Sequence, residues 1–156
     1  MQRSCVLVKP DGIQRGLIGE IISRFERKGL KLLAIKMVKL DDAILDSWYE
    51  HHKTKPFFPN LKKFMTSAPI VAMVWEGLEC IPAVRKLCGV TKGRDAEAGS
   101  IRGDFAMSQS NNLIHASDSA KSAEKEISLM FGEDDIYTYD KDDYCNIYSV
   151  EEWKKE

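Results

Sequence analysis

A run of six apolar residues at positions 70–75, Ile-Val-Ala-Met-Val-Trp, constrains the fold more than any other segment. A strand without alternating polar residues is typical of the centre of a sheet, where both faces are buried. Apolar runs bounded by turn residues predict three further strands, at 5–9, 30–40 and 113–116. The second of these carries interspersed lysines, as expected of a strand with one partly solvated face.

Apolar residues at helical spacing predict helices between these strands. The predicted helices cover residues 18–28, 42–52, 61–65, 80–88 and 120–131. Asp41, Asn60 and the polar residues 117–119 are predicted N-caps, and the Pro-Asp-Gly segment 10–12 predicts a turn. The order of the elements predicts an α+β sandwich in which helices cover a small sheet, as one domain over 1–156.

Two segments lack a regular period. Residues 89–103 carry four glycines and are predicted to form a loop. Residues 132–156 are acidic and rich in tyrosine, with no strong period before Ile147. We expect them to form an extension that packs on the domain or on a neighbouring subunit.

The composition argues against several classes of protein. A formal net charge of −1 provides no bulk attraction to nucleic acid or to an anionic membrane. The four cysteines have no Cys-x-x-Cys spacing and do not pair with histidines at ligand spacing, so no zinc site is expected. Cys5, Cys80 and Cys88 lie in apolar patterns and are predicted to be buried reduced thiols. Without a signal peptide or a membrane-spanning run, the chain is expected to be cytoplasmic.

The segment 112–119, Asn-Leu-Ile-His-Ala-Ser-Asp-Ser, is the strongest candidate for chemistry. His115 lies where a strand should end and a helix should begin, and such a junction exposes backbone N–H groups that can receive an anion. A neutral imidazole can act as a nucleophile. The segment therefore predicts a reactive group beside a phosphate-binding position, although a single histidine on a strand, taken alone, is more often a core or capping residue.

Several polar side chains could bind phosphate groups. Lys9 ends the first strand, Arg85 lies in a predicted helix, and Arg102 lies in a turn. Each would be an ordinary surface residue if taken singly, but together with the Thr91 hydroxyl they could neutralise a triphosphate. The sequence contains neither a P-loop nor a Gly-x-Gly-x-x-Gly fingerprint, so phosphate would be bound by another arrangement.

Aromatic and acidic side chains could complete a nucleotide site. Phe57 follows a proline in a predicted loop, where an exposed ring could stack on a base. Tyr49 and His52 are three residues apart, so they could share one helix face and point at a nucleophile. Glu126 could reach back from its helix to orient the histidine. The simpler alternatives are a core phenylalanine and solvated polar residues.

Five segments, taken together, resemble the nucleoside diphosphate kinase family in order and spacing over essentially the full chain. They are Lys-Pro-Asp-Gly-Ile-Gln-Arg-Gly at 9–16, Lys-Pro-Phe-Phe at 55–58, Pro-Ile-Val-Ala-Met-Val-Trp-Glu-Gly at 69–77, Ile-Arg-Gly-Asp-Phe at 101–105 and Asn-Leu-Ile-His-Ala-Ser-Asp-Ser-Ala at 112–120. The last segment is the family signature. The resemblance implies a ferredoxin-like βαββαβ fold, with a four-stranded antiparallel sheet covered by helices.

The resemblance also implies a role for each candidate residue. His115 would take the γ-phosphate as a phosphohistidine, and Glu126 would hold its imidazole. The residues implied to bind the phosphates and sugar are Lys9, Arg85, Thr91, Arg102 and Asn112. The residues implied to line the rest of the site are Tyr49, His52, Phe57, which would stack on the base, and Ser117.

The implied reaction is ping-pong phosphoryl transfer that maintains the pools of nucleoside triphosphates other than ATP. A triphosphate, mainly ATP, would phosphorylate the enzyme, and a diphosphate such as GDP would collect the group in the same pocket. Mg²⁺ would enter with the nucleotide rather than on protein side chains, because no carboxylate cage is evident. Family members are usually hexamers, so a homo-oligomer is expected, with no nucleic acid or membrane partner.

The chain departs from the family pattern at three positions. Gly93 and Ala98 stand where the family pattern has prolines, in a loop used for subunit packing. Loss of these prolines loosens the loop in the unfolded state and puts the strength of the oligomer in doubt. Gln109 replaces a small apolar residue behind the base.

Two alternative functions are a nucleotide-binding or nucleic-acid-binding module that keeps the fold without the chemistry, and a structural oligomer without a ligand. The intact set of His115, Glu126 and Lys9 and the near-zero net charge argue against the binding module. A structural oligomer would need no cations around a histidine.

Overall fold

The computed structural model describes residues 1–153 and contains a four-stranded antiparallel sheet with the strand order β2-β3-β1-β4. The strands are β1 (Gln2–Val8), β2 (Lys31–Val38), β3 (Ile70–Gly77) and β4 (Ile114–Ala116). All eight residues of β3 are buried, as predicted for the central run. The ferredoxin-like α+β fold is confirmed.

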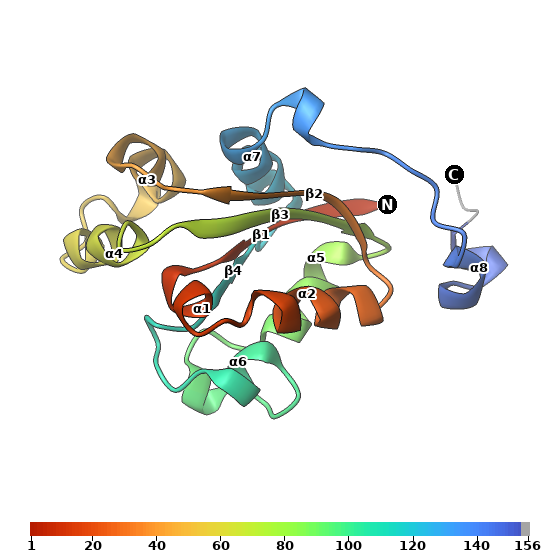
Figure 1. Cartoon of the computed structure of the whole chain (residues 1–156), viewed down its shortest axis with the longest axis horizontal. Helices are drawn as coiled ribbons and strands as arrows, with labels where there is room; N and C mark the ends of the chain where they lie inside the picture. Colours follow the sequence, from red (N-terminus) through yellow and green to blue (C-terminus); the bar gives the residue numbers. More distant parts are fainter. Residues whose placement is uncertain (154–156) are drawn as a thin grey trace.

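The helices lie on both faces of this sheet. They are α1 (Pro10–Gln14), α2 (Ile18–Arg27), α3 (Asp42–Trp48), α4 (Phe58–Met65), α5 (Cys80–Cys88), α6 (Ile101–Phe105), α7 (Ala120–Met130), α8 (Tyr144–Ile147) and α9 (Val150–Trp153). Three 3₁₀ turns join them: η1 (Glu50–His52), η2 (Gly93–Asp95) and η3 (Glu133–Asp135). Figure 1 shows α2 and α5 on one side of the sheet and α7 on the other.

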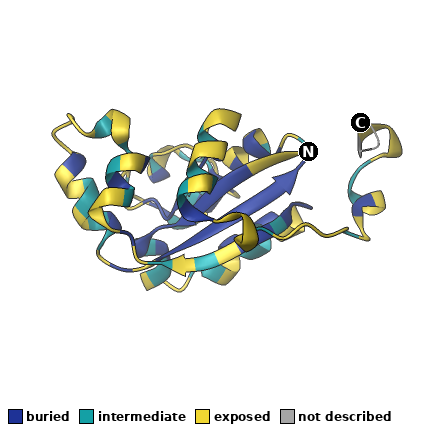
Figure 2. Ribbon diagram, turned by 90° about the horizontal axis from the view of Figure 1, so that it is seen from above, coloured by how far each residue is buried: buried dark blue, intermediate teal, exposed yellow. Residues whose placement is uncertain are grey.

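The two faces carry separate hydrophobic clusters. On one face Phe25 of α2 packs against Trp75 of β3, with ring centroids 5.2 Å apart. On the other face Met130 of α7 packs with Leu45 and Trp48 of α3. Figure 2 shows the strands as mostly buried between helices whose outer surfaces are exposed. The sheet is therefore covered on both sides, and its short strand β4 is positioned between α5 and α7.

The helix starts were predicted with mixed success. Asp41 caps α3 by accepting a hydrogen bond from the N–H of Ile44 at 2.8 Å, and Ser119 caps α7 in the same way. Asn60 was wrongly predicted as a cap, because α4 already begins at Phe58 with a proline in its first turn.

Two loop predictions were also wrong. The segment 10–12 was expected to be a turn but begins α1, because Pro10 stands at the first helical position, where its fixed φ favours a helix. The segment 89–103 was expected to be a loop but contains η2 and part of α6.

The C-terminal segment packs along the edge strand β2. The N–H of Tyr137 donates to the carbonyl of Leu33 at 2.9 Å. The ammonium of Lys31 lies 2.8 Å from the carboxylate of Glu76 and donates to the carbonyl of Tyr139 at 3.0 Å. Lys31 and Glu76 are both buried, so residues 137–139 help to cover an ion pair.

Two further features bear on the earlier expectations. Cys5, Cys80 and Cys88 are buried free thiols, as predicted. No helix in the described part of the chain has both the length and the apolar character needed to cross a bilayer.

Candidate active site

A cleft of about 870 Å³ opens beside β4 and gathers the predicted site residues. Those that line it are Lys9, Tyr49, His52, Phe57, Arg85, Thr91, Arg102, Asn112, His115 and Glu126. Ser117 does not line the cleft; it is buried behind Glu126, which it contacts through a hydrogen bond. These residues come from η1, α5, α6, β4 and α7 and from the segments between elements, so the fold brings together positions up to 117 residues apart.

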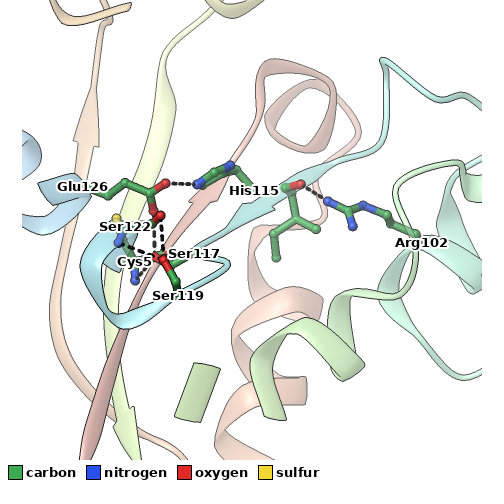
Figure 3. Close-up of polar contacts among 8 residues, drawn as sticks. Cys5, Arg102, His115, Ser117, Ser119, Ser122 and Glu126 are labelled. Carbon is green, nitrogen blue, oxygen red and sulfur yellow. Dashed lines mark hydrogen bonds and ion pairs between the residues drawn. The ribbon is translucent and has the colours of Figure 1, made fainter. Parts of the chain in front are cut away.

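Glu126 connects His115 and Ser117 (Figure 3). Nε2 of His115 lies 2.9 Å from Oε1 of Glu126, and the hydroxyl of Ser117 donates to Oε2 at 2.6 Å. A carboxylate can only accept hydrogen bonds, so this contact places the imidazole proton on Nε2. The lone pair is then on Nδ1, for which the structure shows no hydrogen-bond partner within residues 1–153. The arrangement suits a nucleophilic Nδ1.

A tryptophan that the sequence analysis did not select also positions the histidine. The ring of Trp48 packs edge-on against that of His115, with centroids 5.3 Å apart. Trp48 was predicted only as part of a helix, and its apolar period contained no sign of this contact.

Lys9 is buried at the end of β1, where it contacts the segment that leads into β4. Its ammonium donates to Oδ1 of Asn112 at 2.6 Å. The amide nitrogen of Asn112 donates to the carbonyls of Thr91 and Gln109, both at 2.8 Å. Burial, assisted by the nearby Arg102, lowers the pKa of Lys9 to about 8. The lysine is therefore mostly charged at pH 7 but loses its charge as the pH rises through about 8, and a bound anion would favour the charged form.

Arg102 supports the backbone around the cleft (Figure 3). Its guanidinium donates to the carbonyls of Gly89 at 2.7 Å, Ile114 at 2.6 Å and Asn112 at 3.2 Å. Three of its five N–H groups are thus used by the protein itself, and two stay available for a ligand. Sequence analysis predicted a phosphate-binding arginine but not this structural role.

The aromatic residues form the opposite wall of the cleft. Half of Phe57 is exposed, whereas its neighbour Phe58 is buried. The ring of His52 contacts Phe57 at 5.3 Å and Tyr49 at 6.1 Å between centroids. Tyr49 and His52 were expected on one helix face, but α3 ends at Trp48 and the two rings meet across η1.

Burial also changes the acidity of these groups. It raises the pKa of the Tyr49 hydroxyl, to which the charge of Glu126 adds, so this tyrosine is a neutral hydrogen-bond donor. Burial and the neighbouring His51 and Lys55 lower the pKa of His52. Tyr49 and His52 are therefore both uncharged near neutral pH.

Comparison with known proteins identifies the family. The family model described as Nucleoside diphosphate kinase matches residues 2–136. A nucleoside diphosphate kinase of Staphylothermus marinus is 54% identical over 135 residues, which cover 86% of this chain and 96% of that protein. One from Archaeoglobus fulgidus is 50% identical over 95% of this chain and 98% of that protein. The chain belongs to the nucleoside diphosphate kinase family.

Solved structures of the family support the same conclusion. A halophilic nucleoside diphosphate kinase from Halobacterium salinarum, determined in complex with CDP, superposes with a TM-score of 0.92 at 44% identity, covering 94% of this chain and 98% of that one. A nucleoside diphosphate kinase family protein from Babesia bovis has the same TM-score and identity over 95% of this chain and 100% of that one. Phosphoryl transfer between nucleotides, the enzyme class predicted from the sequence, is thus confirmed by the family.

Gly93, one of the positions at which the sequence analysis expected the family to carry proline, is closely packed. Gly93 donates from its N–H to the carbonyl of Ser108 at 3.1 Å, and a Cβ atom at Gly93 would overlap the carbonyl of Ala106. The expectation that this glycine loosens the loop concerns the unfolded state. In the folded chain the absence of a side chain allows the loop to approach residues 106–108 directly.

Proposed function

We propose that His115 is the phosphoryl carrier of a ping-pong nucleoside diphosphate kinase. Nδ1 would attack the γ-phosphorus of a bound nucleoside triphosphate, mainly ATP, forming an N–P bond as the bond to the bridging oxygen breaks and the diphosphate leaves. A second nucleoside diphosphate would take the group by the reverse step. The observation that carries this proposal is the bond between Nε2 of His115 and Glu126, at 2.9 Å, which directs the free lone pair to Nδ1.

Glu126 would act through the histidine. When Nδ1 forms a bond to phosphorus, positive charge develops on the ring, and the carboxylate at Nε2 offsets it. Ser117 holds the carboxylate in place with its bond at 2.6 Å. Tyr49, which lines the cleft near Glu126, would donate its hydroxyl to a substrate oxygen.

The polar side chains on the other side of the cleft would bind the phosphates. Lys9 carries an ammonium whose only described side-chain partner is Asn112, and an arriving phosphate would favour its charged form. Arg102 keeps two N–H groups for phosphate oxygens, and Arg85 and Thr91 line the same cleft. Catalysis would therefore consist mainly of positioning and charge neutralisation.

The base would stack on Phe57. Its half-exposed ring stands at the entrance with His52 at its edge, and stacking tolerates every base because each has a π-face. Gln109 lines the same cleft and would contact the base or sugar. Donor and acceptor nucleotides could share this one site, since they have the same structure up to the β-phosphate.

Magnesium would be bound mainly by the nucleotide. No group of three or more metal-ligating side chains occurs among the described residues, and of the two carboxylates lining the cleft Glu126 is engaged by His115 and Ser117. Only Asp118, at the rim, could contact a hydrated ion. When bound to the phosphates, Mg²⁺ would supply further charge neutralisation. These donors fit an ion that arrives with its substrate.

We also propose a cytoplasmic homo-oligomer, with the hexamer usual in the family as the expected form. Ile35 and Met37 on the edge strand β2 are about half exposed, and a second copy of the chain could cover them. The part of the C-terminal extension at 135–139 would stabilise a single protomer through its contacts with β2.

Incubation with γ-labelled ATP and Mg²⁺, followed by a GDP chase, tests the reaction. We expect an acid-labile, alkali-stable label on His115 that moves to GDP. ATP binding without a label would indicate a binding module, and the absence of any ATP-dependent shift in melting temperature would indicate a structural oligomer.

A further inference from the structure

Leu113 has a backbone conformation that side chains rarely adopt. Its φ angle is +73°, and it is one of two non-glycine residues with positive φ among residues 1–153. The N–H of Ile114 donates to the carbonyl of Asn112 at 2.8 Å, so Leu113 is the central residue of a three-residue γ-turn. The positive-φ form of this turn is uncommon and strained. A residue held in such a conformation requires its surroundings to keep it there.

The turn stands between two residues of the site. Asn112, on one side, accepts the hydrogen bond from Lys9, and His115 follows two residues later on the other side. Relaxation of Leu113 toward negative φ would rotate both adjoining peptide groups. It would therefore move the phosphate-binding and the phosphate-accepting side chains relative to each other.

The segment Lys-Pro-Asp-Gly at 9–12 holds the turn from the other end of the chain. The N–H of Lys9 donates to the carbonyl of Leu113 at 2.8 Å. The N–H of Leu113 donates a hydrogen bond to Oδ2 of Asp11 at 3.0 Å. Gly12 lies so close that a Cβ atom there would be 3.1 Å from the carbonyl oxygen of Leu113. Both backbone polar groups of Leu113, its N–H and its carbonyl, are thus hydrogen-bonded by this one segment.

The contact of Asp11 is not an ordinary helix cap. Asp11 lies in the first turn of α1, where an acidic residue usually stabilises its own helix. Its hydrogen bond instead reaches a residue 102 positions away, and its other oxygen, Oδ1, is buried with no hydrogen-bond partner in the described part of the chain. A carboxylate that leaves one oxygen unsatisfied is costly to bury. The bond to Leu113 is the evident use of this side chain.

We propose that Asp11 is a positioning residue of the phosphoryl-transfer site, because its carboxylate holds Leu113 in the left-handed conformation that places Asn112 and His115. This inference rests on the proposed function of His115. Asp11 touches neither His115 nor the space where the phosphate would lie, so it acts through the backbone of the turn.

The rate of phosphohistidine formation tests this role. Enzyme would be mixed with excess γ-labelled ATP and Mg²⁺, and the label followed over a single turnover. The final labelled fraction reports how much enzyme is folded, whereas the rate constant reports the geometry within the folded population. A purely structural role would change the first quantity and leave the second unaltered.

We expect Asp11→Ala to lower the rate constant about 10- to 100-fold, the range produced by small misplacements of reacting groups. Asp11→Asn keeps an oxygen that can accept the Leu113 N–H, so it should stay within about threefold of the wild type. Asp135→Ala is the matched control: it removes a similar bond, from the N–H of Gly132 at 3.1 Å, outside the cleft, and should not change the rate constant.

Leu113→Gly supplies a second test, because glycine adopts positive φ without strain. In a chain that already carries Leu113→Gly, the further change Asp11→Ala should lower the rate constant of labelling by no more than about threefold relative to Leu113→Gly alone. The proposal is overturned if Asp11→Ala labels at the wild-type rate constant, if Asp11→Asn is as slow as Asp11→Ala, or if Leu113→Gly gives no rescue. If Asp11→Ala does not fold, Asp11→Asn becomes the deciding variant. A tenfold lower rate constant of labelling in Asp11→Asn would then overturn the proposal. An unlabelled wild type would instead refute the proposed function.

Discussion

Glu126 of α7 lies 2.9 Å, through Oε1, from Nε2 of His115 in β4. The two residues are only 11 positions apart, and Glu126 lies about two turns into α7. The contact exists because α7 folds back across the sheet beside β1. It determines which nitrogen of the histidine carries the proton, and therefore which nitrogen can attack a phosphate.

Replacing Glu126 by Gln should slow phosphorylation of the histidine. The amide carries no charge to offset the developing imidazolium, so we expect kcat to fall about 10- to 1,000-fold while KM changes only severalfold. Steady-state kinetics with ATP and a second nucleoside diphosphate would measure both. Glu124→Gln, on the exposed face of the same helix, is the control. Equal losses in both variants would contradict the assigned role.

His115→Ala should abolish turnover. The nucleophile is lost, whereas the side chains proposed to bind the phosphates are unchanged, so ADP affinity should stay within severalfold of the wild type. Isothermal titration with ADP and a coupled activity assay would separate binding from chemistry. Phosphoryl transfer at a near wild-type rate by this variant would refute the phosphohistidine mechanism.

Nucleotide binding should weaken as the pH rises through about 8. Burial and Arg102 lower the pKa of Lys9 to about 8, while Asp11 partly opposes this shift. The charged form binds phosphate, so protonated Lys9 is present below pH 8 and lost above it. The Kd for ADP should therefore rise about tenfold between pH 7 and pH 9. Lys9→Gln should bind more weakly throughout, with a flat profile over this range; a profile as steep as that of the wild type would exclude Lys9.

Restoring proline at position 93 should destabilise the protein. The ring would overlap the carbonyl of Ala106, and the hydrogen bond from the N–H to Ser108 would be lost, at a combined cost of about 3 kcal/mol. Urea denaturation would measure the change. Ala98→Pro is the matched control, because Ala98 is exposed and its N–H has no hydrogen-bond partner within residues 1–153; it should alter stability by no more than about 1 kcal/mol. If Gly93→Pro were stabilising, the close packing of this loop would be wrong.

Truncation after Ile136 should lower stability without changing the chemistry. It would expose the ion pair between Lys31 and Glu76 and remove the bond from Tyr137 to Leu33, whereas no residue of 137–153 lines the cleft. We expect Tm to fall by about 4–8 °C, equivalent to about 2 kcal/mol. Tyr139→Phe, which removes one hydroxyl bond, should shift Tm by less than half as much. A truncated enzyme with reduced kcat would show that the extension also supports the site.

Much of the fold could be predicted from local patterns. The strand around Met73 is buried on both faces, as its uninterrupted apolar run predicts. The helices around Phe25 and Ile127 bury the faces on which their apolar residues recur. Predictions failed at the starts of α1 and α4. Pro10 and Pro59 lie in the first turns of these helices, where proline is favoured, but each was interpreted as a residue that breaks a helix.

The residues of the candidate site could be predicted from residue types and family resemblance, whereas the geometry of the site could not. Neither Trp48 against His115 nor the three carbonyl contacts of Arg102 has any signal in a linear pattern. Such contacts join residues far apart in the chain, and many alternative partners would satisfy the same local preferences.

The sequence by itself determined the strands, most of the helices, the family and the identity of the histidine, because these depend on side-chain type and spacing along one element. Only the tertiary structure decided which nitrogen of His115 is free, how far burial lowers the pKa of Lys9, and that Asp11 holds the strained backbone of Leu113. Those properties arise from hydrogen bonds and desolvation between elements, and they exist only once the chain has folded and excluded water from between them.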